Sequence, residues 1–154
     1  AVAIYLGVAT AKDSGLLVKQ IRETGFTGII GASVATEAKE FLDIAQAAAE
    51  GIIITAAPFD TDEPDNQAFK EAFIARANGN PPDGFAANGY DAVKLIVLAL
   101  KSCDGDQDPA CIRDFLYGVK NYDGIGGLTT FDRNGDVIKP VMIKTVREGK
   151  FVKY

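Results

Sequence analysis

Short apolar runs alternate with amphipathic segments over the first third of the chain. The apolar runs are rich in Val, Ile and Ala and lie at residues 1–8, 26–30 and 52–56. Between them, residues 13–24 and 36–49 carry apolar side chains at helical spacing, and Gly25 and Gly51 follow as natural helix stops. Strands that alternate with helices predict right-handed crossovers and a parallel sheet. Because the first run is apolar on both faces, we expect helices on each side of that sheet.

The pattern changes after Ala57, where residues 59–65 are acidic and Pro-bearing and predict a crossing. Helical segments then follow one another along the chain. They lie at residues 65–78, 85–102 and 109–120. The segment at residues 85–102 is the longest and has two apolar stripes, so we expect it to be buried on most sides.

The last part of the chain predicts strands joined by tight turns. Residues 128–131 and 137–146 flank Asn134-Gly135, a dipeptide that tolerates positive φ and is the strongest short-range signal for a hairpin. Gly149 predicts a second turn before the run at residues 151–154. We therefore expect the chain to end as a meander.

Charge and length exclude several classes of function. The 154 residues fit one domain with a real core, and the net charge of −5 comes from acidic and basic residues that are interspersed. This distribution predicts no nucleic-acid partner and no anionic lipid surface. The most apolar stretch, residues 92–100, contains Lys94 and is too short to span a bilayer, so we expect no membrane insertion. The opening run also lacks the basic start and cleavage site of a signal peptide.

Cys103 and Cys111 are the only cysteines and flank one short polar loop. A disulfide would close a small ring and contribute about 2.5 kcal/mol, and we favour it over two reduced thiols in a cytoplasmic protein. With no His and no second cysteine pair, we expect no metal site. Asp132, Asn134 and Asp136 lack the further ligands of a calcium loop, which favours an ordinary polar turn.

Motifs for catalysis and cofactor binding are absent from the sequence. The chain has no His, no Gly-x-Ser-x-Gly elbow, no phosphate-binding loop and no dinucleotide fingerprint. We therefore expect a protein that is not an enzyme and holds no cofactor.

Several short motifs occur in a fixed order along the chain. They are Gly25-Phe26, Ala49-Glu50-Gly51, Ala57-Pro58-Phe59-Asp60, Gly89-Tyr90-Asp91-Ala92-Val93 and Thr130-Phe131-Asp132 with Asn134-Gly135-Asp136. In this order they resemble the C-terminal portion of the extracytoplasmic solute-binding proteins of the branched-chain amino acid type, which serve ABC importers. The resemblance covers essentially the whole chain. It implies the type I periplasmic binding protein fold, a three-layer α/β architecture with a mostly parallel sheet, flanking helices and a C-terminal β-hairpin.

The resemblance also implies a division of the chain between two lobes. Residues 1–57 and 124–154 correspond to part of the C-terminal lobe, and residues 58–123 correspond to helices that pack on the N-terminal lobe. The first half of such a protein has no counterpart here, so we expect the helices to expose apolar side chains. Each exposed large side chain forfeits about 1.5–3 kcal/mol of burial. We therefore expect a partner, either the missing lobe or a second copy in a dimer.

The ligand positions that the resemblance implies follow the first two strands. They are Ala9, Thr10, Ala11, Ala32 and Ser33. Ser33 stands where amino acid binders place an acidic residue on the ligand ammonium, and a hydroxyl cannot neutralise a buried cation. An amide or a carboxylic acid is then a better ligand than a free amino acid. The alternative interpretation is that Ser33 only begins a helix and contacts no ligand.

The resemblance implies a periplasmic or extracytoplasmic protein that binds a small molecule and works with a transporter permease. Two alternatives remain open at this point. A ligand-sensing receptor ectodomain uses the same fold, and a kinase or DNA-binding segment elsewhere in the gene would identify it. A stand-alone flavodoxin-like domain would require a sheet that the chain covers completely by itself.

Overall fold

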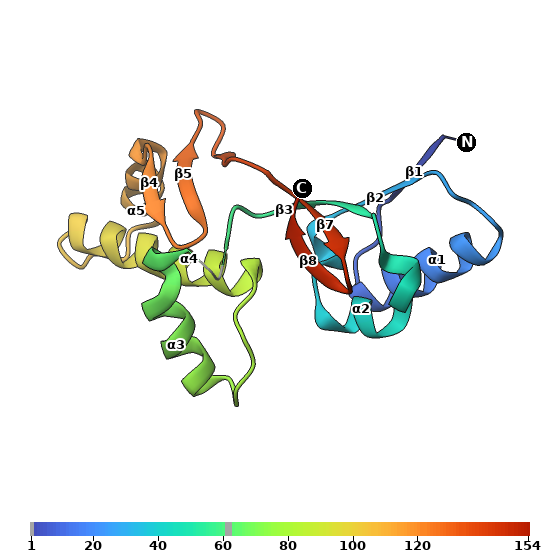
Figure 1. The fold of residues 1–154 in the computed structure, drawn as a ribbon. Coiled ribbons are helices and arrows are strands. Elements are labelled where there is room, and N and C mark those ends of the chain that lie inside the picture. The colour runs from blue at the N-terminus through green and yellow to red at the C-terminus, as the bar shows by residue number, and fades with distance from the viewer. Residues whose placement is uncertain (1, 61–62) are drawn as a thin grey trace. The chain divides into compact units, whose positions relative to one another are not determined.

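The computed structural model describes residues 2–60 and 63–154, and the chain divides into two compact units (Figure 1). The first unit comprises Ala1–Ala57 and Val141–Tyr154, and the second comprises Pro58–Pro140. Ala1 of the first expected strand and residues 61–62 of the expected crossing lie outside the described residues. Residues 124–140, which the resemblance assigns to the same lobe as residues 1–57, belong to the second compact unit.

The first unit contains a sheet with the strand order β1-β2-β3-β7-β8. Its strands are β1 (Ala3–Leu6), β2 (Ile29–Ala32), β3 (Ile53–Ala56), β7 (Met142–Arg147) and β8 (Lys150–Lys153). The first three strands run parallel, and β7 and β8 pair antiparallel as a C-terminal hairpin. Helix α1 (Ala11–Glu23) links β1 to β2. Helix α2 (Lys39–Ala45), between 3₁₀ helices at Val34–Thr36 and Gln46–Ala49, links β2 to β3.

Side chains of the parallel strands alternate between a covered face and an open face. Ile30 and Ile54 are fully buried in the core with Phe41 of α2, whereas Tyr5 is 63% exposed and Ile29 is 52% exposed. In Figure 1, α1 and α2 lie on the same side of this sheet. The α/β class, the mostly parallel sheet and the C-terminal hairpin are confirmed. The expected helices on the second face are not found among the described residues of this unit. This unit therefore does not cover both faces of its sheet by itself, as a stand-alone flavodoxin-like domain requires.

The second unit is made of helices and a small antiparallel sheet with the order β4-β5-β6. The helices are α3 (Gln67–Arg76), α4 (Gly84–Ser102) and α5 (Pro109–Gly118), with a 3₁₀ helix at Pro64–Asn66 before α3. The strands are β4 (Tyr122–Gly124), β5 (Gly127–Phe131) and β6 (Val137–Ile138). The hairpin around Asn134-Gly135 is confirmed, with Gly135 at φ 87°.

The expected meander is wrong because the expected strand at residues 137–146 is broken. Its first part is β6 in the second unit, and its later part is β7 in the first unit. Pro140 lies at the break, and proline has no N–H to continue a strand ladder. The last strands of the chain therefore belong to two different sheets.

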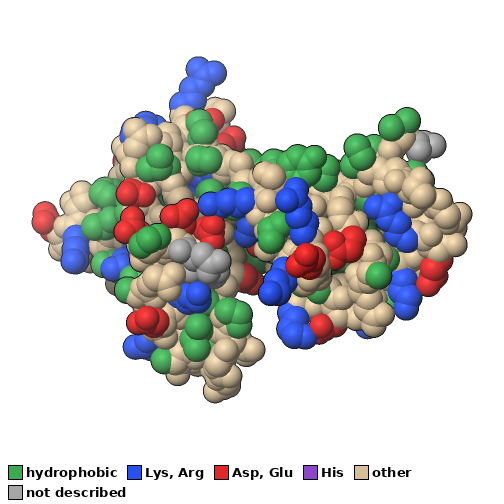
Figure 2. Space-filling model, viewed as in Figure 1, with side chains coloured by type: hydrophobic (Ala, Val, Ile, Leu, Met, Phe, Trp, Pro, Cys, Tyr) green, Lys and Arg blue, Asp and Glu red, His purple; other side chains and the backbone are tan. Residues whose placement is uncertain are grey.

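Helix α4 buries one side and leaves the other in solvent, so the expectation of burial on most sides is wrong. Ala87, Leu95 and Ala99 are buried, whereas Phe85 is 58% exposed and Val93 is 65% exposed. None of the described helices is long and apolar enough to cross a membrane. Figure 2 shows Lys and Arg side chains interspersed with Asp and Glu on the face in view.

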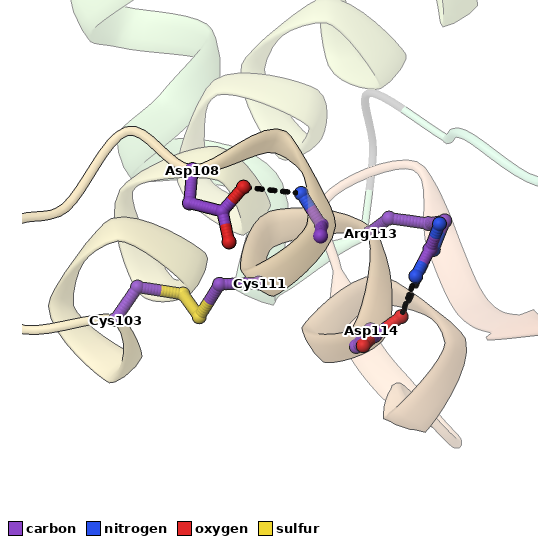
Figure 3. Close-up of polar contacts among 6 residues, drawn as sticks. Cys103, Asp108, Cys111, Arg113 and Asp114 are labelled. Carbon is purple, nitrogen blue, oxygen red and sulfur yellow. Dashed lines mark hydrogen bonds and ion pairs between the residues drawn. A yellow bond between two sulfur atoms is a disulfide. The ribbon is translucent and has the colours of Figure 1, made fainter.

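The loop between α4 and α5 is closed covalently. Cys103 and Cys111 form a disulfide with their Cα atoms 6.2 Å apart (Figure 3). Asp108 begins α5, because its carboxylate accepts the backbone N–H of Ala110 at 3.0 Å. The bond therefore ties the end of one helix to the first turn of the next.

Candidate ligand-binding site

The expected ligand positions lie at one edge of the first unit's sheet. Because β1 and β2 are parallel neighbours, the loops that follow them leave the sheet at the same edge. Ala9 and Thr10 are exposed in the first of these loops, and Ser33 is half-buried directly after β2. Ala11 begins α1 and is buried, and Ala32 ends β2 with no exposed surface. The side chains of Ala11 and Ala32 therefore belong to the core, and only the other positions face solvent.

Ser33 links the two loops directly. Its Oγ donates a long hydrogen bond of 3.5 Å to the backbone oxygen of Val8. Ser33 precedes the 3₁₀ helix at Val34–Thr36, but its side chain caps no backbone N–H there. Ser33 therefore lies at a helix start, as the interpretation without a ligand requires, but it forms no capping bond. Its hydroxyl donates to the neighbouring loop instead.

A second pair of hydroxyls holds the start of α1 against the loop after β2. Ser14 Oγ and Thr36 Oγ1 lie 2.9 Å apart, and both residues are fully buried. A buried hydroxyl is costly unless it is hydrogen-bonded, so this pair fixes the two segments relative to each other. A buried hydrogen bond therefore joins the two segments that carry the candidate positions.

Thr10 is the N-cap of α1, whereas the sequence predicts Asp13 or Ser14 at that position, so the helix begins earlier than expected. Its Oγ1 accepts the backbone N–H of Asp13 at 3.0 Å and donates to Asp13 Oδ2 at 2.8 Å. This reciprocal arrangement satisfies a helix N–H that has no partner inside the helix. The Thr10 hydroxyl therefore has a structural role in this arrangement.

Acidic groups next to these loops are already paired. Asp13 accepts from Thr10, and Glu37 forms an ion pair with Lys144 of β7. The side chains of Glu37 and Lys144 are 17% and 14% exposed, so this pair is shielded from water much more than a surface ion pair. Thr10 and Ser33 thus present hydroxyl groups, Glu37 is neutralised by Lys144, and Asp13 keeps a negative charge that the neutral Thr10 hydroxyl does not cancel. No group of three or more His, Cys, Asp or Glu among the described residues is placed to hold a metal ion.

Sequence reasoning missed a buried polar centre in the second unit. Asp91 of α4 is 3% exposed, and its carboxylate accepts the backbone N–H groups of Ile125 at 2.9 Å and Gly126 at 2.7 Å. A Cβ on Gly124 would come within 2.4 Å of the same carboxylate. Lys139 lies nearby, where burial lowers its pKa and the charge of Asp91 opposes that shift. The sequence offered Asp91 only as part of the motif Gly89-Tyr90-Asp91-Ala92-Val93, which does not report its partners.

Comparison with known proteins assigns a family to the chain. The family model described as "Periplasmic binding protein" matches residues 1–150. The Leu/Ile/Val-binding protein BraC3 of Rhizobium johnstonii is 26% identical over 125 residues, which are 81% of this chain and 34% of that protein. The leucine-, isoleucine-, valine-, threonine- and alanine-binding protein of Pseudomonas aeruginosa is 27% identical over 81% of this chain and 33% of its own length. The chain therefore spans about a third of these curated relatives.

Solved structures give the same result at the level of the fold. The leucine-binding protein LivK of Thermotoga maritima is 29% identical, with a TM-score of 0.84 over 99% of this chain and 43% of its own. The branched-chain amino acid binding protein LivJ of Streptococcus pneumoniae, solved with isoleucine, is 29% identical, with a TM-score of 0.80 over 97% of this chain and 42% of its own. An extracellular ligand-binding receptor of Desulfohalobium retbaense is 26% identical, with a TM-score of 0.83 over 100% of this chain and 26% of its own.

Proposed function

Because this chain belongs to the periplasmic binding protein family, we propose that it forms part of an extracytoplasmic solute-binding protein that delivers a small organic ligand to the permease of an ABC importer. The observation that carries this proposal is the family match over residues 1–150. The curated relatives are named as binding proteins for branched-chain amino acids, and none of the names describes an enzyme. A periplasmic or extracytoplasmic location agrees with the Cys103–Cys111 disulfide, because such bonds persist in oxidising compartments.

The proposal includes an assignment of the chain to two lobes. Residues 1–57, with the C-terminal strands, form part of the C-terminal lobe, and the helices within residues 58–123 belong to the N-terminal lobe. The division into two compact units supports this assignment, although residues 124–140 cluster with the helices and not with the first unit. The ligand then binds at the carboxyl ends of β1 and β2, where open α/β sheets place their ligands.

The ligand class follows from the charges at that edge of the sheet. Ser33 offers a neutral hydroxyl where an acidic residue would pair with an ammonium group, and the nearby acid Glu37 is already paired with Lys144. A free amino acid would bring an ammonium group that needs a carboxylate partner when it is desolvated. The site therefore favours an amide or a carboxylic acid over a free amino acid.

A charge-restoring variant tests the role of Ser33. The chain and its Ser33→Glu variant are titrated with L-leucine, isovaleramide and isovalerate in a calorimeter. We expect the variant to gain about tenfold or more in affinity for L-leucine, since a charge-assisted hydrogen bond contributes roughly 1.5–3 kcal/mol. The variant is expected to lose affinity for isovalerate because the two carboxylates repel each other.

Ser102→Glu is the matched control, because Ser102 is an exposed residue at the end of α4. This control should leave the affinity for each compound unchanged. Equal affinity of the Ser33 variant and the unchanged chain for L-leucine would remove Ser33 from the site. Thr10→Tyr is a second probe, since it places an aromatic ring in the first loop at the cost of the N-cap.

The proposal also includes a polypeptide partner, either a second copy of the chain or the remaining lobe. Large apolar side chains are exposed on the open sheet face of the first unit and on α4 of the second. They include Tyr5, Ile29, Ile143, Phe85, Val93 and Val97. Leaving such surface in water forfeits about 1.5–3 kcal/mol for each side chain. Native mass spectrometry should find a dimer or a complex with a second fragment, and a monodisperse 16.3 kDa monomer would contradict the partner.

A receptor ectodomain is the second candidate function. The similarity to the Desulfohalobium retbaense receptor favours it, because this chain covers only 26% of that longer protein. A kinase or DNA-binding segment encoded in the same gene would select the receptor, and a neighbouring permease gene would select the importer.

A further inference from the structure

Helices α4 and α5 lie close to β5 in the second unit (Figure 1). A cavity of about 330 Å³ is lined by residues of α4, α5 and the β5–β6 hairpin. Its wall is mostly apolar and includes Leu95, Leu116, Phe131 and Val137. Asp91 and Lys139 supply polar groups to the same lining. A small cavity with an apolar body and a few convergent polar groups has the general character of a ligand site. All of its lining residues belong to the second unit, so the ligand positions proposed at Thr10 and Ser33 are not part of it.

Lys139 provides a hydrogen-bond donor at the polar side of this cavity. Its ammonium donates to Asn88 Oδ1 at 2.7 Å and to the backbone oxygen of Gly126 at 3.1 Å. An ammonium group carries three hydrogens. Among the described residues, no acceptor is found for the third hydrogen of Lys139.

Asp91 provides an acceptor beside that donor. The backbone N–H groups of Ile125 and Gly126 occupy one site on each of its oxygens. A carboxylate has about four acceptor sites, so part of its capacity remains. The negative charge of Asp91 offsets the positive charge of Lys139, and a ligand with a net charge would be attracted by one and repelled by the other.

We propose that this cavity binds a small neutral carboxamide with an apolar body. The carbonyl oxygen of the ligand accepts from Lys139, and its NH₂ group donates to Asp91. The apolar body lies against Leu95, Leu116 and Phe131. This site is separate from the ligand site of the proposed function and does not depend on it.

Chemical-shift mapping on the isotope-labelled chain tests the proposal with three probes of the same shape. They are cyclohexanecarboxamide, cyclohexanecarboxylate and cyclohexylmethylamine. We expect the carboxamide to shift the amide signals of Leu95, Thr129 and Phe131 with a dissociation constant on the order of 1 mM. The carboxylate and the amine are expected to bind at least tenfold more weakly. Tighter binding by either charged probe, or shifts confined to residues outside the cavity, would overturn the proposal.

Two variants separate the polar contact from the cavity itself. Lys139→Met removes the donor but keeps an apolar stem, and should weaken carboxamide binding at least tenfold. Val137→Trp fills the cavity from a position that is 48% exposed, so the fold accepts it and binding should be lost even if the first variant is unstable. Unchanged binding by a folded Val137→Trp chain would overturn the site.

Matched controls keep this test distinct from the test of the proposed function. Lys101→Met changes an exposed lysine on α4, the helix that carries Asp91, and should leave carboxamide binding unchanged. Ser33→Glu should also leave the shifts at Leu95, Thr129 and Phe131 unchanged. A loss of those shifts in Ser33→Glu would place the carboxamide in the first unit and overturn the second site.

Discussion

The two units exclude water by different means. The first unit has a contiguous core in which Ile30, Phe41 and Ile54 are fully buried. The second unit buries mainly small side chains of α4 together with Phe59 and Leu95, and no residue of α3, all of whose residues are described, is buried. Instead, its helices and hairpin are held by the Cys103–Cys111 disulfide and by the carboxylate of Asp91.

The two units therefore differ in the interactions that stabilise them. Hydrophobic burial scales with the apolar area removed from water, so the first unit gains most from its large buried side chains. The second unit exposes comparable side chains, such as Phe85 and Val93, and gains from covalent closure and charge-assisted hydrogen bonds. The first unit should therefore be sensitive to cavities, and the second to loss of specific bonds.

The largest expected effect is a cavity in the first unit. Phe41 is fully buried, and its ring lies 6.1 Å from that of Phe151. Phe41→Ala should lower the free energy of unfolding by about 3–5 kcal/mol, from lost burial and the cavity that remains. Urea unfolding with residue-level hydrogen exchange would measure this loss. Leu16→Ala on α1 is the control, because Leu16 is 43% exposed and should cost about 1 kcal/mol or less.

Loss of protection from hydrogen exchange spread equally over both units in Phe41→Ala would contradict the separate stabilisation of the two units. It would mean that the units unfold as one cooperative body. Loss of protection confined to residues 2–57 and 141–154 would support separate stabilisation, since separate units are expected to open separately.

The polar centre of the second unit gives the next effect. Asp91→Ala leaves the N–H groups of Ile125 and Gly126 without their acceptor, and each unsatisfied buried donor costs about 1–3 kcal/mol. We expect a total loss of about 2–4 kcal/mol, with faster hydrogen exchange at residues 124–127. Asp123→Ala is the matched control because Asp123 is exposed, and it should change stability by less than about 0.5 kcal/mol. Equal effects of the two variants would contradict a special role for Asp91.

The disulfide gives a similar but slightly smaller effect. Replacing both Cys103 and Cys111 by Ser should cost about 2.5 kcal/mol, the chain-entropy value for a loop this short. Hydrogen exchange should quicken at the end of α4 and the start of α5, while β1 to β3 keep their protection. Loss of protection in the first unit would show that it depends on this bond.

Sequence reasoning found the elements whose residue pattern is local. The β-branched runs of β2 and β3, the stop at Gly25 with φ 84° and the turn at Asn134-Gly135 all follow from short-range preferences. It missed β4 (Tyr122–Gly124), because that strand has no apolar alternation and depends on pairing with β5. Pro140 was overlooked as a strand break, although its missing N–H was readable from the sequence.

The candidate site could be predicted only as far as chain order allowed. The resemblance placed Thr10 and Ser33 at the ends of neighbouring strands, and the parallel register of β1 and β2 puts them at one edge. It did not predict that Ala11 and Ala32 face the core, or that Thr10 caps α1. The contacts between Asp91 and the loop at Ile125 span 34 positions in the chain, a separation that no local pattern reports.

The smallest expected effect is a pH dependence in the second unit. Burial raises the pKa of Tyr122, and the negative charge of Asp91 adds to the increase. The unfolded chain then releases this proton at a lower pH than the folded chain, so stability falls as pH rises above about 10. The lowered pKa of Lys139 has the opposite sign, because there the unfolded chain holds its proton longer and stability rises with pH.

Comparing the pH dependence of stability of the chain and of its Tyr122→Phe variant separates the effect of Tyr122 from that of Lys139. Ultraviolet titration of the five tyrosines should show a late step from Tyr122, because burial raises its pKa, and Tyr122→Phe should remove that step. Tyr5→Phe is the control, because Tyr5 is 63% exposed on the first unit and its loss should leave the late step in place. If the late step persists in Tyr122→Phe, the second unit does not shield its β4 tyrosine from water. The contrast between an open, bond-stabilised unit and a buried, core-stabilised one would then be larger than the structure indicates.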